Sequence, residues 1–188
     1  MSSPAAASQG VVRHPEWVIH CDGTALPNPG RMGLGAVLVA PGGATTSLSR
    51  QAPGTGCNNE AELRALLLAL DEACRQGALC LVISSDSSVL VDQMRPHSPN
   101  APAPRPIARL APMFEEARRA LQRFDTVRWQ WIPRHRNGQA DALARAAVGL
   151  APKPHSRPRS ATRSLSDLER RKRKSAPART VFAEFAAP

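Results

Sequence analysis

The sequence predicts an α/β fold with a five-stranded mixed sheet and helices on both of its faces. Strand-length runs of β-prone residues bounded by turn residues occur five times, and three of them precede any segment with helical spacing. The remaining runs alternate with helical segments, which is typical of β-α-β units with parallel crossovers. The predicted order of elements is therefore β-β-β-α-β-α-α-β-α within 188 residues.

Three strands open the predicted domain. The first covers 16–22, a β-prone run that ends at Asp22 and is followed by the turn-rich sequence Pro-Asn-Pro-Gly. The second covers 33–40 and leads into Pro-Gly-Gly, which favours a hairpin turn, and the third covers 44–50. Together they should form an antiparallel meander.

A long helix follows over 58–77, where four leucines fall at helical spacing. Asn58 or Asn59 is available as its N-cap, and Gly77 is the expected stop. The apolar run 79–84 then predicts a fourth strand, which ends just before Asp86. A short helix over 89–94 comes directly behind it.

The second half of the domain contains two more helices and one strand. Residues 96–106 are rich in proline and predict a loop, and spaced apolar residues predict a helix over 107–121. A fifth strand is expected over 127–133 and a closing helix over 139–148. In that strand Trp129 and Trp131 alternate with Gln130, so both should pack on a face of the sheet rather than stack on nucleic acid.

Both ends of the chain lack the apolar pattern of a folded domain. Residues 1–15 are small and polar and are expected to be disordered, which leaves 16–150 as the folded domain. Residues 151–188 are rich in Pro, Ser, Arg and Lys and should form a disordered basic tail.

Charge and composition limit the class of function. The net charge is +10, and residues 151–188 hold ten Lys and Arg against three Asp and Glu, so most of the excess lies in the tail. A basic chain of this kind favours a polyanionic partner. The hydrophobic fraction of 42% includes no run near the roughly 18 apolar residues of a membrane span, so no membrane association is expected. The start of the chain does not resemble a secretory signal, which favours a cytoplasmic location.

Four carboxylates stand at positions where they can meet. Asp22 and Asp86 close the first and fourth strands, and ligands gather at such strand ends in α/β sheets. Glu62 and Asp141 lie early in their helices, where each alone could equally be a helix N-terminal charge. Hydrolysis of a phosphodiester needs an activated water and a neutralised leaving oxygen. Two divalent ions held by carboxylate oxygens supply both.

Four motifs occur in the order and at the spacing of one known family. They are Asp22-Gly23-Thr24 with Asn28-Pro29-Gly30, then Asn58-Asn59-Glu60-Ala61-Glu62-Leu63, then Ser85-Asp86-Ser87, and finally Asn137-Gly138-Gln139-Ala140-Asp141 with Leu143-Ala144. Over residues 16–149 the chain resembles type 1 ribonuclease H (RNase HI), in the compact bacterial form that lacks a basic handle. The resemblance implies a ribonuclease H-like fold, with 16–150 as the catalytic domain.

The resemblance also implies an activity and a cofactor. The chain should be a monomeric endonuclease that hydrolyses the RNA strand of RNA/DNA hybrids and leaves 5′-phosphate and 3′-hydroxyl ends. Asp22, Glu62, Asp86 and Asp141 are its implied catalytic and metal-binding residues. They would hold two Mg²⁺ ions, for which Mn²⁺ should substitute.

Substrate contacts are implied for five further residues. Gly23, Thr24 and Asn28 should lie beside the RNA strand, and Asn58 and Asn59 should reach into the minor groove. An A-like minor groove exposes 2′-hydroxyl groups, and amide side chains can both donate to them and accept from them.

Two features depart from the larger family members. His135 precedes the last catalytic Asp and is a candidate proton shuttle, but its loop is short, so an exposed histidine without a role is an equal alternative.

Only the proline-rich segment stands where other members carry a basic handle. The basic tail should therefore supplement binding to the nucleic acid backbone, or dock a protein partner through residues 181–185.

Two rival functions remain open at this point. The chain could act on another RNA-containing duplex, such as double-stranded RNA or an RNA-DNA junction. It could also be a catalytically idle nucleic-acid-binding module. The intact carboxylate set argues against the idle module, because clustered acids repel phosphate when no metal is bound.

Overall fold

A computed structural model describes residues 14–95 and 107–153 and shows the predicted fold class. The elements follow one another in the predicted order: β1 Glu16–Leu26, β2 Gly30–Val39, β3 Thr45–Gly56, α1 Asn58–Arg75, β4 Cys80–Ser85, α2 Ser88–Met94, η1 Ala108–Leu110, α3 Ala111–Leu121, β5 Thr126–Trp131, η2 Arg134–Arg136 and α4 Gly138–Ala146. The two η elements are single 3-10 turns. The predicted loop over 96–106 and the predicted tail from residue 154 lie outside the described residues.

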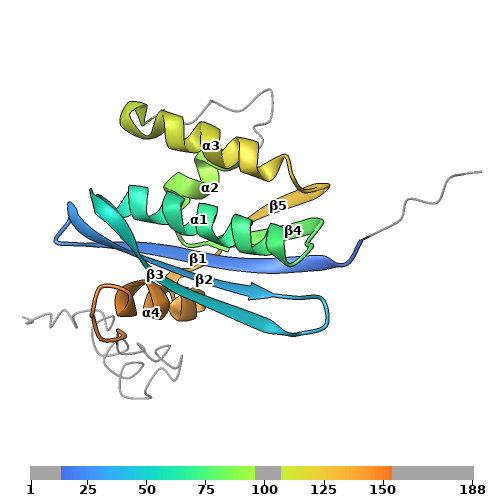
Figure 1. Ribbon diagram of the computed structural model, residues 1–188, viewed down its shortest axis with the longest axis horizontal. Helices are drawn as coiled ribbons and strands as arrows, with labels where there is room; N and C mark the ends of the chain where they lie inside the picture. Colours follow the sequence, from blue (N-terminus) through green and yellow to red (C-terminus); the bar gives the residue numbers. More distant parts are fainter. Residues whose placement is uncertain (1–13, 96–106, 154–188) are drawn as a thin grey trace, which may run out of the picture. The chain divides into compact units, whose positions relative to one another are not determined.

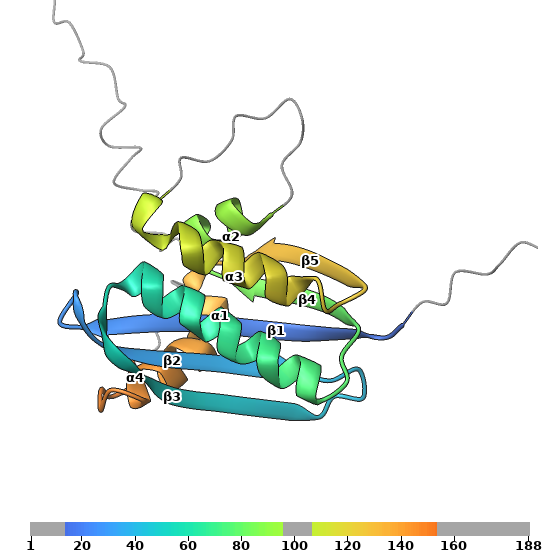
Figure 2. The same ribbon diagram turned by 45° about the horizontal axis from the view of Figure 1, so that its top comes forward.

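The sheet is mixed, with five strands in the order β3-β2-β1-β4-β5. The pairs β1–β2 and β2–β3 are antiparallel, as a meander requires, while β4 pairs in parallel with β1 and with β5. Helices α1, α2 and α3 cover one face of the sheet and α4 covers the other (Figures 1 and 2). The prediction of helices on both faces is therefore confirmed.

Helix α1 lies against the centre of the sheet. Its buried face alternates small and large apolar residues: Ala61, Leu63, Ala65, Leu66, Ala69, Leu70 and Ala73. Each fully buried leucine contributes roughly 1.5–3 kcal/mol relative to an exposed one, and the alanines let the helix axis approach the strands. Gly77, with a φ of +77°, follows the helix end and confirms the predicted stop. The predicted N-cap is wrong, because Cys57 occupies that position.

Strand β1 is longer than predicted, and this changes the place of Asp22. The parallel pairing with β4 ends at His20, but the antiparallel pairing with β2 continues from Val18 to Leu26. Asp22 therefore lies inside β1 rather than at its end, opposite Gly35 of β2. It still stands just beyond the last residue that pairs with β4, so the expected proximity to the end of β4 is retained.

The two tryptophans of β5 differ in their surroundings. Trp129 is half-buried against the core, as predicted. Trp131 is 52% exposed, so its predicted burial on the sheet is wrong. The reason is its position at the end of an edge strand, where no further strand covers it. Its indole Nε1 donates a hydrogen bond to the backbone oxygen of Asp86, at 3.2 Å.

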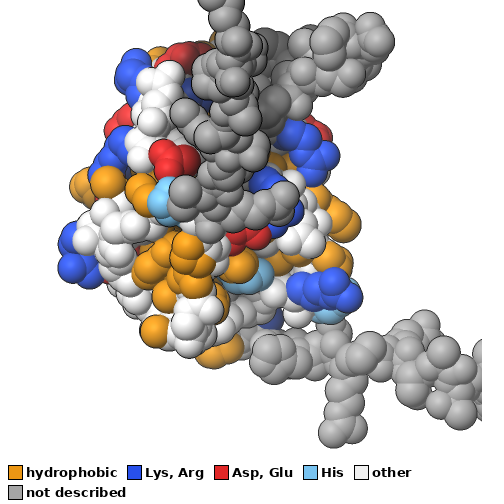
Figure 3. Space-filling view, turned by 90° about the vertical axis from the view of Figure 1, so that its right-hand side faces the viewer, with side chains coloured by type: hydrophobic (Ala, Val, Ile, Leu, Met, Phe, Trp, Pro, Cys, Tyr) orange, Lys and Arg blue, Asp and Glu red, His pale blue; other side chains and the backbone are white. Residues whose placement is uncertain are grey.

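The surface at the end of the sheet where β1 begins is mixed in character. Basic, acidic and apolar side chains are interspersed over the coloured part of this face, and no large area of one charge stands out (Figure 3). In the part of the chain that the structure describes, no helix has the length and apolar character needed to cross a membrane.

Candidate active site

Two glycines bring helices from both faces close to the sheet beside Asp22. A Cβ atom at Gly23 of β1 would lie 2.1 Å from the backbone of Ala61 in α1. A Cβ atom at Gly35 of β2 would lie 2.2 Å from the backbone oxygen of Ala140 in α4. No larger residue fits at either position without moving a helix. These are the helices that carry Glu62 and Asp141.

The four predicted carboxylates form one electrostatic cluster. The pKa of Asp22 is raised to about 7, first by burial and then by the negative charges of Asp86, Asp141 and Glu62. The backbone N–H of Gly23 donates to Asp22 Oδ1 at 2.9 Å and offsets part of this effect. Each carboxylate therefore makes it harder to ionise Asp22, and the cluster has a surplus of negative charge.

Glu62 shares this environment from the first turns of α1. Burial raises its pKa, and a hydrogen bond with Ser87 opposes that change. The charge of Asp86 raises the pKa further, while the charge of Arg134 lowers it. Residues from η2 and from the segment after β4 thus act on this carboxyl group of α1.

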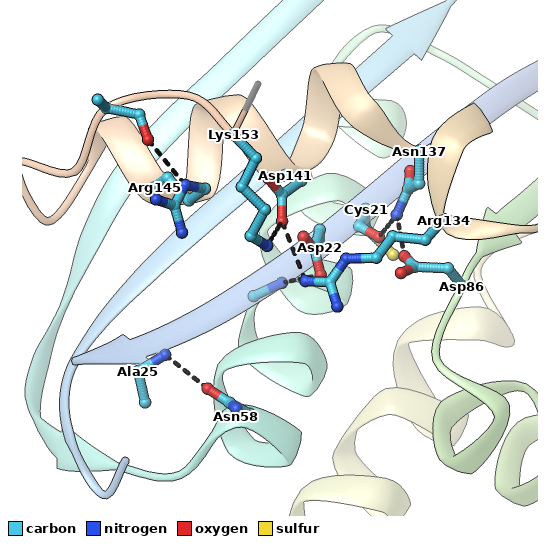
Figure 4. Close-up of polar contacts among 12 residues, drawn as sticks. Cys21, Asp22, Ala25, Asn58, Asp86, Arg134, Asn137, Asp141, Arg145 and Lys153 are labelled. Atoms are coloured by element: carbon cyan, nitrogen blue, oxygen red, sulfur yellow. Dashed lines mark hydrogen bonds and ion pairs between the residues drawn. The ribbon is translucent and has the colours of Figure 1, made fainter. Parts of the chain in front are cut away.

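Asp141 differs from the other acids because it already has cationic partners. Its side chain is 11% exposed, and its Oδ1 lies 2.5 Å from Lys153 Nζ and 3.3 Å from Arg134 Nη2 (Figure 4). Burial raises the pKa of Asp141, but the ion pairs with Lys153 and Arg134 outweigh it and leave the pKa below its usual value. Sequence reasoning missed both partners and assigned Lys153 to the solvated tail.

Asn137 links the segments that carry the acidic cluster and was not singled out by the sequence as a support. It is 1% exposed, and its Nδ2 donates to Asp86 Oδ1 at 2.6 Å and to the backbone oxygen of Cys21 at 3.0 Å (Figure 4). Its own backbone oxygen accepts from the N–H of Asp141 at 3.0 Å. One side chain thus ties β1, the segment after β4 and the start of α4 together. The available signal was its place in the last motif.

Two of the predicted substrate-contact residues bind each other. Asn28 Oδ1 accepts from the backbone N–H of Asn58 at 3.2 Å, and Asn58 Oδ1 accepts from the N–H of Ala25 at 2.8 Å. Asn28, rather than Asn58 or Asn59, therefore supplies a side-chain acceptor at the start of α1. Gly23 and Thr24 lie on the adjoining part of β1. The five predicted residues thus lie in β1 after Asp22, in the turn that follows it and at the start of α1.

His135 lies exposed on η2, next to Arg134. Its position on the short segment between β5 and α4 is the one expected from the sequence. A catalytic role for it stays a prediction.

The donor set suits a hard divalent cation. In residues 14–95 and 107–153, no three Asp, Glu, His or Cys side chains converge as ligands of one ion. The acids nevertheless offer only carboxylate oxygens, which are the ligands that Mg²⁺ takes, and their mutual repulsion would be relieved by a cation. The residues therefore fit such an ion, although Asp141 is directed to Lys153 and Arg134 instead.

A mixed five-stranded sheet with acidic side chains from β1, α1, α4 and the end of β4 defines the class of ribonuclease H-like proteins. Comparison with known proteins agrees: the family model described as reverse transcriptase-like matches residues 20–147. The chain is 30% identical over 152 residues to a ribonuclease H of Ruegeria sp. (strain TM1040), a match that covers 73% of this chain and 93% of that protein.

A second relative is a bifunctional protein of Mycobacterium tuberculosis, 36% identical over 135 residues, or 71% of this chain. The match spans only 36% of the length of that mycobacterial protein.

Two solved structures show the same arrangement. The N-terminal RNase H domain of a Mycobacterium tuberculosis protein, solved as a fusion with maltose binding protein, has 33% identity and a TM-score of 0.60 and covers 70% of this chain and 98% of that one. An RNase H1 solved in complex with an RNA/DNA hybrid has 28% identity and a TM-score of 0.60, and the match covers 70% of this chain and 96% of that one. The chain therefore belongs to the reverse transcriptase-like family and, within it, to the ribonuclease H family.

Proposed function

We propose that the chain is an endonuclease that hydrolyses the RNA strand of RNA/DNA hybrids and leaves 5′-phosphate and 3′-hydroxyl ends. The observation that carries this proposal is the charge cluster around Asp22, in which the negative charges of Asp86, Asp141 and Glu62, each from a different segment, raise the pKa of Asp22. A similar structure was solved with an RNA/DNA hybrid, which supports the substrate class.

Asp22, Glu62, Asp86 and Asp141 are the residues that would hold the metal. When bound, two Mg²⁺ or Mn²⁺ ions supply an activated water and stabilise the charge on the leaving oxygen. The chain's own side chains position this site: Asn137 fixes Asp86, and the N–H of Gly23 fixes Asp22. Since these supports are part-buried, Asp22 and Asp86 are held before substrate arrives.

Recognition of RNA is assigned to the segment of β1 after Asp22 and to the start of α1. The side chain of Asn28 accepts from the backbone N–H of Asn58, and the side chain of Asn58 accepts from the N–H of Ala25, so these amide groups near the strand are preorganised. Contacts to 2′-hydroxyl groups separate RNA from DNA, and Asn59 and Thr24 have the donors and acceptors to make them.

Cleavage of four labelled duplexes by the purified chain tests this function. We expect the RNA/DNA hybrid to be cut with Mg²⁺ and to stay intact in EDTA, and the DNA duplex to stay intact throughout. Equal cleavage of double-stranded RNA or of an RNA-DNA junction would favour the first rival function. Tight hybrid binding without any cleavage would favour the idle module.

His135 provides a narrower prediction. If it assists proton transfer or product departure, His135→Ala should lower turnover by about ten- to a hundredfold and leave hybrid affinity nearly unchanged. Arg136→Ala on the same exposed turn is the matched control for loss of a basic side chain near phosphate. Unchanged turnover in His135→Ala would assign the histidine no catalytic part.

The basic tail is proposed to add non-specific affinity for the phosphate backbone. Of the ten Lys and Arg residues after residue 150, nine lie after residue 155. Truncation after His155 should therefore raise KM and flatten the salt dependence of binding, because fewer counterions are released. The value of kcat at saturating hybrid should not change.

Binding titrations at several salt concentrations measure this effect. If the logarithm of the binding constant fell with the logarithm of salt concentration at the same slope for the full and truncated chains, the tail would not contact the substrate. A role for residues 181–185 in docking a protein partner would then be the remaining proposal for the tail.

A further inference from the structure

We propose that Lys153 is an internal counter-ion of Asp141, which a divalent cation must displace, and that it thereby sets the metal affinity of the site. This inference rests on the proposed metal-binding role of Asp141. Arg134 also pairs with Asp141. The two cations lie on a single carboxylate oxygen, Oδ1, at 2.5 Å and 3.3 Å.

The position of Lys153 is built by the chain and is not that of a free end. Helix α4 ends at Ala146, and Gly149, with a φ of +78°, turns the backbone. The N–H of Leu150 donates to the oxygen of Arg145 at 3.0 Å, and Arg145 Nε donates to the oxygen of Ala151 at 2.8 Å. These bonds direct the returning segment along α4, so that Lys153 reaches Asp141 twelve residues after it (Figure 4).

Lys153 is the stronger of the two partners. Its ammonium group is closer to Asp141 than the guanidinium of Arg134, and its side chain is 43% exposed against 68% for Arg134. A charge pair that is less exposed is less screened by water and salt. Removal of Lys153 should therefore have the larger effect on Asp141.

A divalent cation and an ammonium group compete for Asp141 because both are cations that would be held by the same carboxylate. Like charges at such short separation repel, so the ammonium must leave before the ion binds. The free energy of the broken pair is subtracted from that of metal binding. Neutralising Lys153 should consequently tighten the binding of the metal alone, without any nucleic acid.

Calorimetric titration of the full-length, EDTA-stripped chain with Mn²⁺ tests this inference. We expect Lys153→Met to bind Mn²⁺ about three- to tenfold more tightly than wild type, and Lys153→Arg to stay nearer to wild type. Arg75→Met is the matched control for net charge, because Arg75 lies at the far end of α1 and pairs with Glu72. Its affinity should remain within about twofold of wild type.

A second comparison assigns the effect to Asp141. In an Asp141→Asn background the Lys153→Met change should no longer tighten Mn²⁺ binding, since the pair is already lost. The inference would be overturned if Lys153→Met bound Mn²⁺ no more tightly than wild type. It would also be overturned if Lys153→Met still tightened Mn²⁺ binding in the Asp141→Asn background.

Wild-type titration and hybrid cleavage report separately on the proposed function. If the wild type bound Mn²⁺ and cut hybrid, but Lys153→Met had the same Mn²⁺ affinity as wild type, only the counter-ion role of Lys153 would be rejected. Failure of the wild type both to bind Mn²⁺ and to cut hybrid would remove the function and this inference together.

Discussion

Asp22→Asn is expected to lower hybrid cleavage by at least about a thousandfold, with hybrid binding retained. Asp22 is the residue on which the charges of the other three acids converge. Replacing its carboxylate by a neutral amide removes the charge at the centre of the proposed metal site, which should cost about 4 kcal/mol of transition-state stabilisation. Single-turnover cleavage of a labelled hybrid measures the loss.

Asp125→Asn is the matched control, because Asp125 is an exposed residue before β5 and lies outside the cluster. It should cleave at the wild-type rate. If Asp22→Asn retained more than about a tenth of wild-type activity, Asp22 would not have the proposed role.

In the absence of metal, the Asp22→Asn variant should be at least as stable as wild type. The pKa of Asp22 is raised from 3.8 to about 7 in the folded protein. Between these two pH values the folded protein keeps a proton on Asp22 that the unfolded chain has already released. Wild type should therefore lose stability as pH rises from about 4 to about 7, by on the order of 2–4 kcal/mol. Asn cannot ionise and lacks this loss. Thermal unfolding in EDTA at both ends of this pH range thus shows whether lost cleavage reflects misfolding.

Gly35→Ala should damage both the fold and the site. The new Cβ would lie 2.2 Å from the oxygen of Ala140 and 2.4 Å from the nitrogen of Ala144, so α4 must move away from the sheet. We expect a loss of roughly 1–3 kcal/mol or more in the free energy of unfolding, as for other overpacked sites. Because α4 carries Asp141, cleavage should fall by about a hundredfold even in the folded fraction.

Gly42→Ala is the control, since nothing lies within 4 Å of a Cβ at that turn position. Chemical denaturation and single-turnover kinetics of the two variants measure the difference. Wild-type stability and cleavage in Gly35→Ala would contradict the close approach of α4 to β2.

The order of the elements was predictable because it depends on local patterns. The leucine spacing of α1 and the glycine after it are read within one segment, and both predictions are confirmed. The end of β1 was not predictable from the same information. Its last residues are held by β2 alone, so the strand continues past the point where β4 stops. Pairing between distant segments decides such boundaries, and turn residues do not reveal it.

The acids of the candidate site were predictable from the sequence, but the contacts that support them were not. The motifs named the four acids, and the structure brings them within electrostatic reach of one another. The contacts of Asn137, Arg134 and Lys153 could not be foreseen, because each joins segments separated by other elements. The contact of Lys153 in particular depends on the chain turning back after α4, and the composition of that segment predicted only a solvated tail.

Cleavage of a labelled RNA/DNA hybrid as a function of Mg²⁺ concentration, with analysis of the product ends, tests the central claim most directly. We predict that the RNA strand alone is cut, that the rate rises from zero in EDTA to a plateau with Mg²⁺, and that the fragments carry 5′-phosphate and 3′-hydroxyl groups. Cleavage that persists in EDTA, or a hybrid that is bound but never cut at any Mg²⁺ concentration, would contradict a metal-dependent ribonuclease H built on these carboxylates.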